Sequence, residues 1–394
     1  MEISDEENMI LSMGPQHPST HGVLRLVLEL DGEKIVNLAS DIGFLHTGVE
    51  KSMESKTYTK ALVMTDRLDY LAPMSNNLGY ILAVEKLLGI EAPPRAQAIR
   101  MILTEMQRVS SHLVWLGTSC LDLAAMTVFL FAFREREYIL DVFEMVAGQR
   151  MMVSYFRPGG LWRDVPEEFE AAVREFLDFM PARIADYEAM TKLNPIFLSR
   201  TKEVGYISGD DAIQWGLTGA SLRASGVDWD IRKEYPYLMY DKVEFDVPVE
   251  TAGDVYARYL CRMQEMKESL RIIEQCMDML PKLGKEVNAS DRKVVPPPRS
   301  ELGQSMEAVI HHFKLWTEGF KAPEGYVKMS IESPRGEFMC YLRGDGTAKP
   351  ARVHMRTPSY VNLAALPVMS KDLYVADLIA IIGSVDIVLG EIDR

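Results

Sequence analysis

The sequence predicts an α+β protein in which a central helical bundle forms the main body and small antiparallel sheets come from the N- and C-terminal parts. Three patterns predict this class. Leucines alternate with other residues over 23–30 and Asp31-Gly32 follows at once, which is typical of a β-hairpin. Apolar residues recur at three- and four-residue steps through much of 52–294, which predicts helices. Alternation returns between 325 and 355, which predicts a second set of strands.

The composition is that of a globular protein, with 47% hydrophobic and 25% charged residues. A formal net charge of −14 argues against nucleic acid and against anionic lipid as partners. The four cysteines are scattered and form no Cys-x-x-Cys pair, so they indicate neither a disulfide framework nor a cluster-binding motif and favour a reducing compartment. Because the first residues are acidic and lack an apolar run, we expect no signal or transit peptide.

Residues 1–51 are predicted to form an N-terminal β-sheet region. The apolar run Met9–Met13 and the alternating run described above flank the stretch Gly14-Pro-Gln-His-Pro-Ser-Thr-His-Gly22. The prolines and glycines of that stretch argue against a regular helix. We therefore expect a strand–loop–strand corner with His17 and His21, two of the seven histidines, at its tip.

Residues 52–294 are predicted to form the helical bundle, with an irregular insertion at 194–250 that is rich in Gly, Pro, Asp and aromatic residues. Pro93-Pro94 is typical of a helix start. The segment Leu113–Phe133 holds a single charge, Asp122, and is long enough to span a bilayer. Small polar residues interrupt it and charges of both signs follow it, so we favour a buried central helix over a membrane span.

Residues 295–394 are predicted to contain a linker, a helix and a C-terminal α/β region. The sequence Val-Pro-Pro-Pro-Arg at 295–299 predicts a stiff linker, and a helix is expected near 301–319. Strand patterns and short helical patterns fill the remainder. We expect the three regions to form one continuous structural unit.

His17 and His21 admit two interpretations. Imidazole, with an unperturbed pKa of about 6.5, exchanges protons near neutrality and also binds metals. Two imidazoles are an incomplete set because a zinc site needs at least three protein ligands, and His46 or His112 could supply the third. The alternative is an ordinary loop in which the histidines bond backbone groups. Metal binding is the less favoured of the two.

Asp122 and Tyr70 are the other candidates. A carboxyl group in an apolar run must be held neutral, with a raised pKa, or be paired with a cation. The cation could be a protonated histidine or an arginine of a neighbouring helix, and the spacing favours neither over the other. Tyr70 could donate its phenolic proton to a carbonyl or simply fill the core. No phosphate loop, dinucleotide fingerprint or nucleophile elbow is present, so any electron carriers must lie on another chain.

Several stretches together resemble the 49-kDa-type (D-type) subunit of NADH–quinone oxidoreductase (respiratory complex I), a family related to the large subunit of nickel–iron hydrogenases. The resemblance runs from about residue 9 to residue 394. The stretches that carry it are Gly14-Pro-Gln-His-Pro-Ser-Thr-His-Gly-Val-Leu-Arg25, Gly43-Phe-Leu-His-Thr-Gly48, Glu50-Lys51, Arg67-Leu-Asp-Tyr-Leu71, Ser111-His-Leu113, Phe133-Arg-Glu-Arg-Glu137, Leu222-Arg-Ala-Ser-Gly226 and Ser384-Val-Asp-Ile-Val-Leu-Gly-Glu-Ile-Asp-Arg394.

The resemblance implies a hydrogenase-large-subunit-like fold and a quinone site. His21 and Tyr70 match the pair that contacts the quinone headgroup in the family. Asp122 matches the carboxylate that is linked to this histidine, and His17 lies in the same loop. We therefore take His21, Tyr70 and Asp122 as the catalytic candidates and His17, His21 and Tyr70 as the quinone-binding ones.

The same resemblance argues against a metal centre on this chain. Val388, Glu391 and Arg394 stand where the hydrogenases have Cys, Cys and His ligands. Without thiolates a nickel–iron centre cannot form, and a former metal cavity is expected to hold the quinone headgroup. Quinone is thus expected as the substrate and no metal as a cofactor.

The implied role is that of the quinone-site subunit of a proton-translocating NADH:quinone oxidoreductase, not active alone. Electrons would come from an iron–sulfur cluster in an adjacent subunit, while NADH and FMN bind other subunits. The expected partners are the subunit carrying the terminal cluster, the 30-kDa-type subunit and the membrane subunit at the quinone channel. The expected location is peripheral, on the cytoplasmic side of the cell inner membrane. Two alternatives stay open: the equivalent subunit of a ferredoxin-, coenzyme F420- or NAD(P)H-fed relative, and a non-catalytic hydrogenase-like scaffold.

Two positions depart from many family members. Thr47 stands where many have an arginine, and Met152 stands where many have a histidine near the terminal iron–sulfur cluster. Because Met152 cannot titrate, the pH dependence of the cluster's potential is expected to be weak.

Overall fold

The computed structural model describes residues 8–20 and 22–394. The N-terminal sheet is antiparallel with the order β1-β2-β3, and its strands are β1 (Met9–Met13), β2 (Arg25–Asp31) and β3 (Lys34–Asp41). Leu26 and Leu28 of β2 are fully buried while their neighbours are partly exposed, as the alternation predicts. β1 pairs with β2, so the predicted strand–loop–strand corner is confirmed, and η1 (Pro18–Thr20) lies within it.

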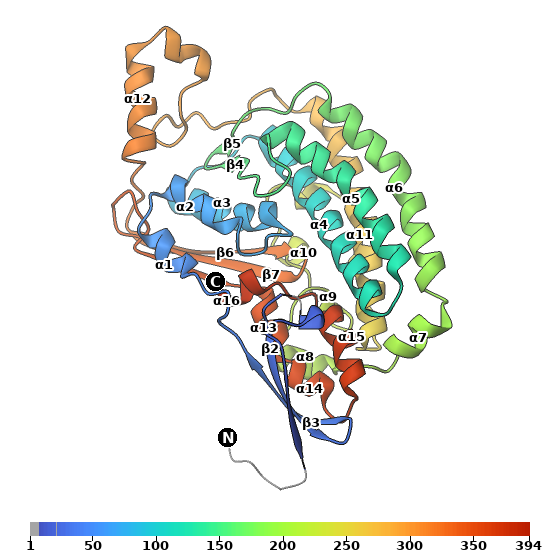
Figure 1. Ribbon diagram of the computed structural model, residues 1–394. Helices are drawn as coiled ribbons and strands as arrows, with labels where there is room; N and C mark the ends of the chain where they lie inside the picture. The colour runs from blue at the N-terminus through green and yellow to red at the C-terminus, as the bar shows by residue number, and fades with distance from the viewer. Residues whose placement is uncertain (1–7, 21) are drawn as a thin grey trace.

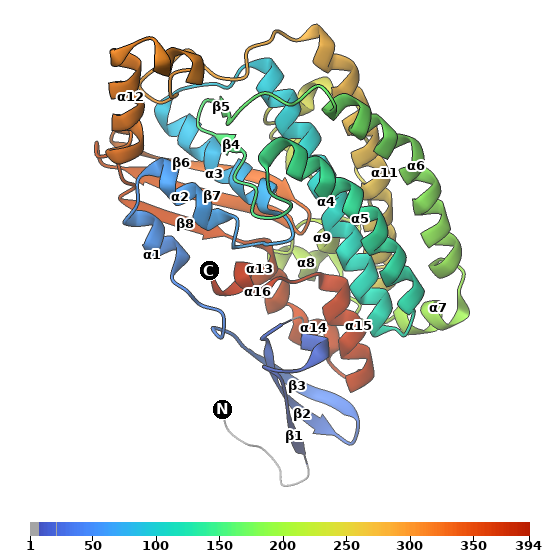
Figure 2. The same ribbon diagram turned by 45° about the horizontal axis from the view of Figure 1, so that its top comes forward.

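Four long helices form the bundle and lie side by side in both views (Figures 1 and 2). They are α4 (Pro94–Asp122), α5 (Met126–Ala147), α6 (Phe169–Thr191) and α11 (Val255–Met279). Three further helices precede them: α1 (Val49–Glu54), α2 (Tyr58–Thr65) and α3 (Pro73–Leu88). Pro94 stands in the first turn of α4, as its position in the sequence predicts.

The second sheet is antiparallel with the order β6-β7-β8, and its strands are β6 (Gly325–Ser333), β7 (Gly336–Gly344) and β8 (Arg352–Arg356). Helix α3 lies directly on this sheet. A β-carbon at Gly79 of α3 would lie 2.7 Å from the ring of Phe338, so the absence of a side chain permits the close approach. The fold class is thus confirmed: a helical body with small antiparallel sheets from both parts of the chain.

One helix prediction is wrong. The chain does not continue as a single buried helix through Leu113–Phe133, because it turns between α4 and α5, where Ala124 has a φ of +65°. Beyond the turn, Met126 and Leu130 are 60% and 59% exposed, so the apolar run is not wholly buried. Asp122, the last residue of α4, is half-buried. Among the described residues, no helix is both long and apolar enough to cross a membrane.

The predicted irregular insertion contains short helices joined by loops. These are α7 (Pro195–Thr201), α8 (Gly209–Gln214), α9 (Ala220–Arg223), α10 (Ile231–Glu234) and η2 (Tyr240–Lys242). A short hairpin, β4 (Phe156–Arg157) with β5 (Gly160–Leu161), precedes α6. After α11 come η3 (Leu280–Lys282), η4 (Arg299–Gly303) and α12 (Met306–Thr317), and α12 projects from the body in Figure 1.

The C-terminal helices bring the far parts of the chain together. They are α13 (Pro358–Ala364), α14 (Leu366–Ser370), α15 (Val375–Val385) and α16 (Leu389–Asp393). Their apolar side chains, including Leu378 and Ile382, share one buried cluster with Leu26 and Leu28 of the N-terminal sheet. In both views α16 lies between the β6–β8 sheet and the N-terminal sheet (Figures 1 and 2).

Candidate functional site

A buried guanidinium group joins three distant segments of the chain. Arg335, in the turn between β6 and β7, donates from Nη1 to Asp69 Oδ2 at 2.5 Å and to Ser111 Oγ of α4 at 3.0 Å. Its Nη2 donates to Asp386 Oδ1 at 3.2 Å, just after α15. All of these side chains are buried. Three stretches that carry the family resemblance, at 67–71, 111–113 and 384–394, therefore meet at this arginine.

Glu391 adds a third carboxyl group to this cluster. It is fully buried, its Oε2 accepts from the hydroxyl and the N–H of Ser359, and its Oε1 has no hydrogen-bond partner in the part of the chain that the structure describes. Burial first, and then the charge of Asp69, raises the pKa of Glu391 to about 8. The hydrogen bonds of Arg335 go to Asp69 and Asp386, whereas those of Glu391 come from Ser359, so burial favours the protonated form of Glu391.

Tyr70 lies at the edge of this cluster. A β-carbon at Gly390 would lie 3.5 Å from Tyr70 Cδ1 and 2.6 Å from the carbonyl oxygen of Leu68, so α16 packs directly on the tyrosine segment. Burial raises the pKa of the Tyr70 phenol, the charge of Asp69 raises it further, and Arg335 opposes the rise. The phenol therefore stays protonated and can donate a hydrogen bond.

The loop 43–48 is tied to the end of α16. The carboxylate of Asp393 accepts from the N–H groups of Gly43 at 2.8 Å and Leu45 at 2.6 Å. Nδ1 of His46 lies 2.6 Å from the carbonyl oxygen of Asp393, and because a carbonyl only accepts, Nδ1 carries the proton. Thr47 follows His46 in the same loop.

The loop of the first motif also reaches α16. His17 is exposed and its Nδ1 accepts from the N–H of Ser19 at 3.2 Å. A β-carbon at Gly22 would lie 3.3 Å from Leu389 Cδ1, so the end of this loop packs on the residue next to Gly390. His21 itself lies outside the described residues, and its place in the site stays a prediction.

Asp122 is not part of the Arg335 cluster. It follows Ser111 by eleven residues along α4, which is about 16 Å at the rise of an α-helix. There it lines a small cavity with Ser119, Tyr259 and Gly383. The cavity is linked to α15, because Ser119 Oγ donates to the carbonyl oxygen of Gly383 at 3.2 Å. The predicted pairing of Asp122 with His21 stays a prediction.

The other histidine considered as a metal ligand, His112, lies in the core. Its Nε2 is 2.7 Å from Oε2 of Glu265, and burial lowers its pKa although Glu265 opposes this shift. Glu265 also accepts from Arg223, which in turn donates to Glu332 Oε1 at 2.8 Å. Among the described residues, no group of three or more His, Cys, Asp or Glu side chains is arranged to hold a metal ion.

Neither Arg335 nor Ser359 was predicted from the sequence. Arg335 lies in the turn Ser333-Pro-Arg-Gly336 between two alternating strands, a kind of position that is ordinarily exposed. The only available signal was the position of this turn between two stretches of strand pattern. Asp69 and Glu391 were present in the quoted motifs, but only the fold shows that they share one cation.

Comparison with known proteins gives one consistent result. The family described as respiratory-chain NADH dehydrogenase, 49 Kd subunit, matches residues 122–394. The chain is 60% identical over 391 residues to the NADH-quinone oxidoreductase D subunit numbered 2 of Roseiflexus sp. (strain RS-1), covering 99% of this chain and 94% of the relative. It is 54% identical over 392 residues to the NADH-quinone oxidoreductase D subunit of Geotalea uraniireducens (strain Rf4), covering 100% of both chains. The D subunit numbered 2 of Koribacter versatilis (strain Ellin345) is 54% identical over 394 residues, covering 100% of this chain and 98% of the relative.

Proposed function

This chain belongs to the 49-kDa, or D-type, family of NADH-quinone oxidoreductase subunits, and from this premise we propose that it binds the quinone headgroup and helps to protonate it. The chain is thus part of an enzyme complex and works with the other subunits. In the proposal, electrons arrive from an iron–sulfur cluster held by a partner subunit, and NADH and FMN bind elsewhere in the complex. The chain would sit peripherally on the cytoplasmic side of the inner membrane, beside the membrane subunit.

The observation that carries the proposal is the phenol of Tyr70, whose pKa is raised, packed against Gly390 of α16, the helix that also carries the buried acid Glu391. Reduction of a quinone to a quinol takes two electrons and two protons. Tyr70 would donate a hydrogen bond to one carbonyl oxygen and then its proton, and His21 would serve the other carbonyl. Glu391, whose pKa burial raises to about 8, is carried by the helix that packs against the Tyr70 segment and is suited to replenish a proton there.

Coupling to proton pumping forms the second part of the proposal. Loss of a proton from His21 would remove the charge that pairs it with Asp122, and the carboxylate would reorganise. A change of charge at a buried site can bias two conformations of the surrounding structure. The hydrogen bond from Ser119 to Gly383 of α15 supports this coupling, because α15 ends directly before Asp386, which bonds Arg335. A displacement at the cavity that Asp122 lines could thus be transmitted through α15 to the Arg335 cluster.

The test is quinone reductase activity of Tyr70→Phe and His21→Ala in the assembled complex. Each variant is expected to lower kcat by about a hundredfold, because each removes a positioned proton donor. NADH oxidation with an artificial acceptor that takes electrons ahead of the quinone site should stay normal. Tyr326→Phe, at a tyrosine that is 71% exposed, is the matched control.

Wild-type rates and wild-type quinone affinity in both variants would refute the assignment. Such a result, with normal assembly, would instead favour the non-catalytic scaffold.

A further inference from the structure

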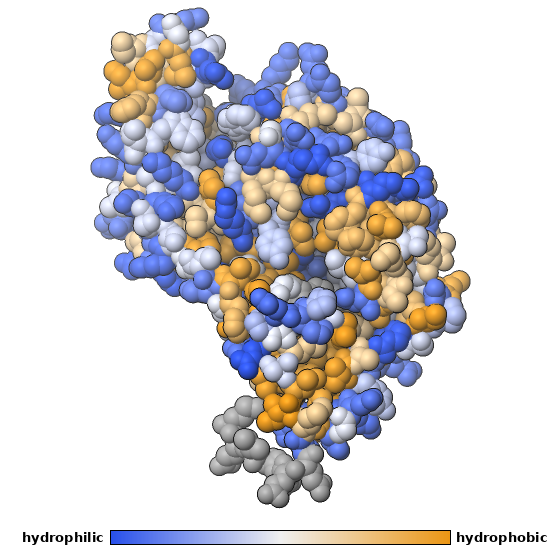
Figure 3. Space-filling view, in the orientation of Figure 1, coloured by the Kyte–Doolittle hydropathy of each residue, from blue (hydrophilic) through white to orange (hydrophobic). Residues whose placement is uncertain are grey.

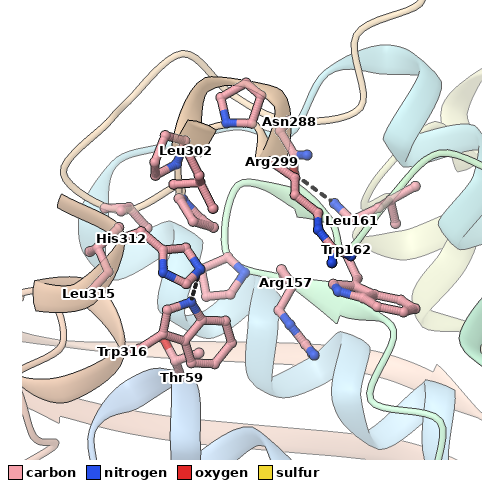
Figure 4. Close-up of a pocket in the computed structure, with 15 residues that line it drawn as sticks. Thr59, Arg157, Leu161, Trp162, Asn288, Arg299, Leu302, His312, Leu315 and Trp316 are labelled. Atoms are coloured by element: carbon pink, nitrogen blue, oxygen red, sulfur yellow. Dashed lines mark hydrogen bonds between the residues drawn. The ribbon is translucent and has the colours of Figure 1, made fainter. Parts of the chain in front are cut away.

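The open cavity at α12 is separate from the candidate site. It has a volume of about 460 Å³ and lies between α12, the proline segment 294–302 and the β4–β5 hairpin, with Trp162 and Trp316 in its wall (Figure 4). Figure 3 shows hydrophobic side chains gathered on the projecting α12 region. None of the residues that line this cavity belongs to the Arg335 cluster. The side chains that connect to that cluster from elsewhere in the fold are buried.

His112 and Arg223 belong to two of the stretches that carry the family resemblance, and neither has a role in the proposed proton transfer. Both bond the carboxylate of Glu265 in α11. Arg223 is the last residue of α9, and its Nη1 also donates to Glu332 Oε1 at 2.8 Å. All four side chains are buried. Arg223 therefore connects α11 to the end of β6.

Glu332 anchors the turn that carries Arg335. Its Oε2 accepts from the N–H of Ile231 at 3.4 Å. Its backbone is fixed as well, since its carbonyl oxygen accepts from Arg108 Nη2 at 2.6 Å and its N–H donates to the hydroxyl of Tyr237 at 3.2 Å. Only two residues separate Glu332 from Arg335 along the chain. A displacement of Glu332 would therefore displace Arg335.

The segment before α9 packs on the same turn, backbone against backbone. A β-carbon at Gly219 would lie 2.5 Å from Gly336 Cα and 2.9 Å from the carbonyl oxygen of Arg335. Nδ2 of Asn362 donates to that carbonyl oxygen at 3.2 Å. Such close packing leaves the turn little room to relax when one of its contacts changes.

The contacts that hold Arg335 are connected through the core. On one side its turn is held from Arg223, and on the other its Nη1 donates to Ser111 Oγ at 3.0 Å. Ser111 directly precedes His112, and the carboxylate that His112 bonds also accepts from Arg223. The position of the Arg335 guanidinium group is therefore set from both sides by the same buried charges.

We propose that Glu332 is a positioning residue of the quinone site and acts through Arg335. Held by Arg223, it fixes the turn from which the Arg335 guanidinium group bonds Asp69. Asp69 directly precedes Tyr70, so this bond sets the place of the phenol, and a small displacement of a reacting group costs a large part of a rate. The inference rests on the proposed quinone role of Tyr70.

The contact between Glu332 and Arg223 changes with pH near neutrality. Burial raises the pKa of Glu332 to about 7; the charge of Asp230 adds to the shift, and the charges of Arg223 and Arg232 oppose it. Below this pH Glu332 is neutral and its attraction to Arg223 weakens, so Arg335 is held more firmly above pH 7 than below it. The ionisable groups around Glu332 are Arg223 at the end of α9, Asp230 and Arg232 at α10, Tyr237 after α10, Glu105 and Arg108 of α4, and Glu265 of α11.

The test is the pH profile of kcat/KM for quinone in the assembled complex from pH 6 to 8. In the wild type we expect a step centred near pH 7, with kcat/KM about fivefold lower on the acid side. Glu332→Gln keeps the size of the side chain and an oxygen for Arg223 but loses the charge, so it should show the low value at every pH and lack the step. Glu332→Asp, which keeps a titrating carboxyl group, should retain a step. Glu324→Gln, at an exposed carboxylate directly before β6, is the matched control and should keep the wild-type profile.

A purely structural role of Glu332 gives a different result, because it would lower kcat/KM by the same factor at every pH. A step retained in Glu332→Gln, at whatever overall rate, would therefore overturn the proposal, and so would the absence of a step near pH 7 in the wild type.

A double-mutant cycle measures whether Glu332 acts through Arg335. Glu332→Gln and Arg335→Lys should each lower kcat/KM at pH 8, and the double variant should lower it by clearly less than the product of the two effects. A reduction equal to that product would contradict the inference. The pH profile decides the matter even where Arg335→Lys does not assemble.

Tyr70→Phe is measured in parallel to separate the two proposals. A wild-type rate and quinone affinity in Tyr70→Phe would count against the quinone role itself. An impaired Tyr70→Phe together with a wild-type profile in Glu332→Gln would overturn only the positioning role of Glu332.

Discussion

Glu391 shows how burial changes the chemistry of a single residue. In water its carboxyl group would be ionised at neutral pH, but in the fold burial raises its pKa from 4.5 to about 8. By the resemblance described in the sequence analysis, this position is expected to match a metal-binding cysteine of the nickel–iron hydrogenases. A carboxyl group with a pKa near neutrality, on the helix that packs against Tyr70, has the property that the proposed proton delivery to a quinone requires.

Glu391 also makes the stability of the chain depend on pH. Between pH 4.5 and about 8 the folded chain keeps a proton that the unfolded chain releases, so the free energy of unfolding falls as pH rises through this range. Glu391→Gln removes this titration while its amide oxygen can still accept from Ser359. We expect the variant to lack this part of the pH dependence and to be more stable than wild type at pH 8, by on the order of a few kcal/mol.

Denaturant unfolding of the full chain from pH 5 to 8 measures this effect. Glu324→Gln, at an exposed carboxylate, should reproduce the wild-type slope. An identical slope in Glu391→Gln would show that Glu391 is ionised in the folded chain.

At the scale of elements, α16 organises the site. This helix has five residues and contacts three loops. Asp393 accepts hydrogen bonds from the loop 43–48, Leu389 packs against the end of the first-motif loop, and Gly390 packs against the tyrosine segment. Its docking depends on close backbone contact, because a β-carbon at Gly390 would lie 2.6 Å and 2.8 Å from the carbonyl oxygens of Leu68 and Arg67. Backbone atoms on both sides leave little room for relaxation.

Gly390→Ala should therefore displace α16 even though alanine favours helices. We expect a loss of about 1–3 kcal/mol in stability and a higher KM for quinone, since Tyr70 packs on the same position. Gly284→Ala is the control, because a β-carbon there meets no atom within 4 Å and the φ of Gly284 is not positive. Thermal unfolding and quinone kinetics in the assembled complex give the two readouts; unchanged values for Gly390→Ala would mean that α16 does not position Tyr70.

At the scale of the whole molecule, the fold forms a cavity wall around Met152 that lacks groups titrating near neutrality. Met152 lies in this wall with Val63, Arg67 and Arg157, and the described residues of the wall include no histidine or carboxylate. By the resemblance described in the sequence analysis, Met152 stands where a histidine is expected in many family members. If the partner's terminal iron–sulfur cluster faces this wall, no histidine among the described lining residues can take up a proton when the cluster is reduced.

The potential of that cluster should accordingly change little with pH. In the assembled complex we expect a slope between pH 6 and 8 of less than half of the ~59 mV per unit that one proton per electron gives. Met152→His should steepen the slope, and Leu193→His, at a distant residue that is 82% exposed, should not. The slope is measured by redox potentiometry in which the cluster's electron paramagnetic resonance signal is monitored. A full proton-coupled slope in the wild type would contradict the prediction.

The sequence by itself determined the fold class, the strands and hairpins at both parts of the chain, the start of α4 at Pro94 and the family. Alternation, helical periodicity and turn residues depend only on residues that are close in the sequence, so they can be read without knowing the tertiary structure. It did not determine the break after Asp122, because no glycine or proline marks the positive φ of Ala124. It also could not show that Arg335, Asp69, Asp386 and Glu391 share one buried site. These residues are brought together only by tertiary packing, and the electrostatic energy that sets their protonation depends on distances and burial that exist only in the folded chain.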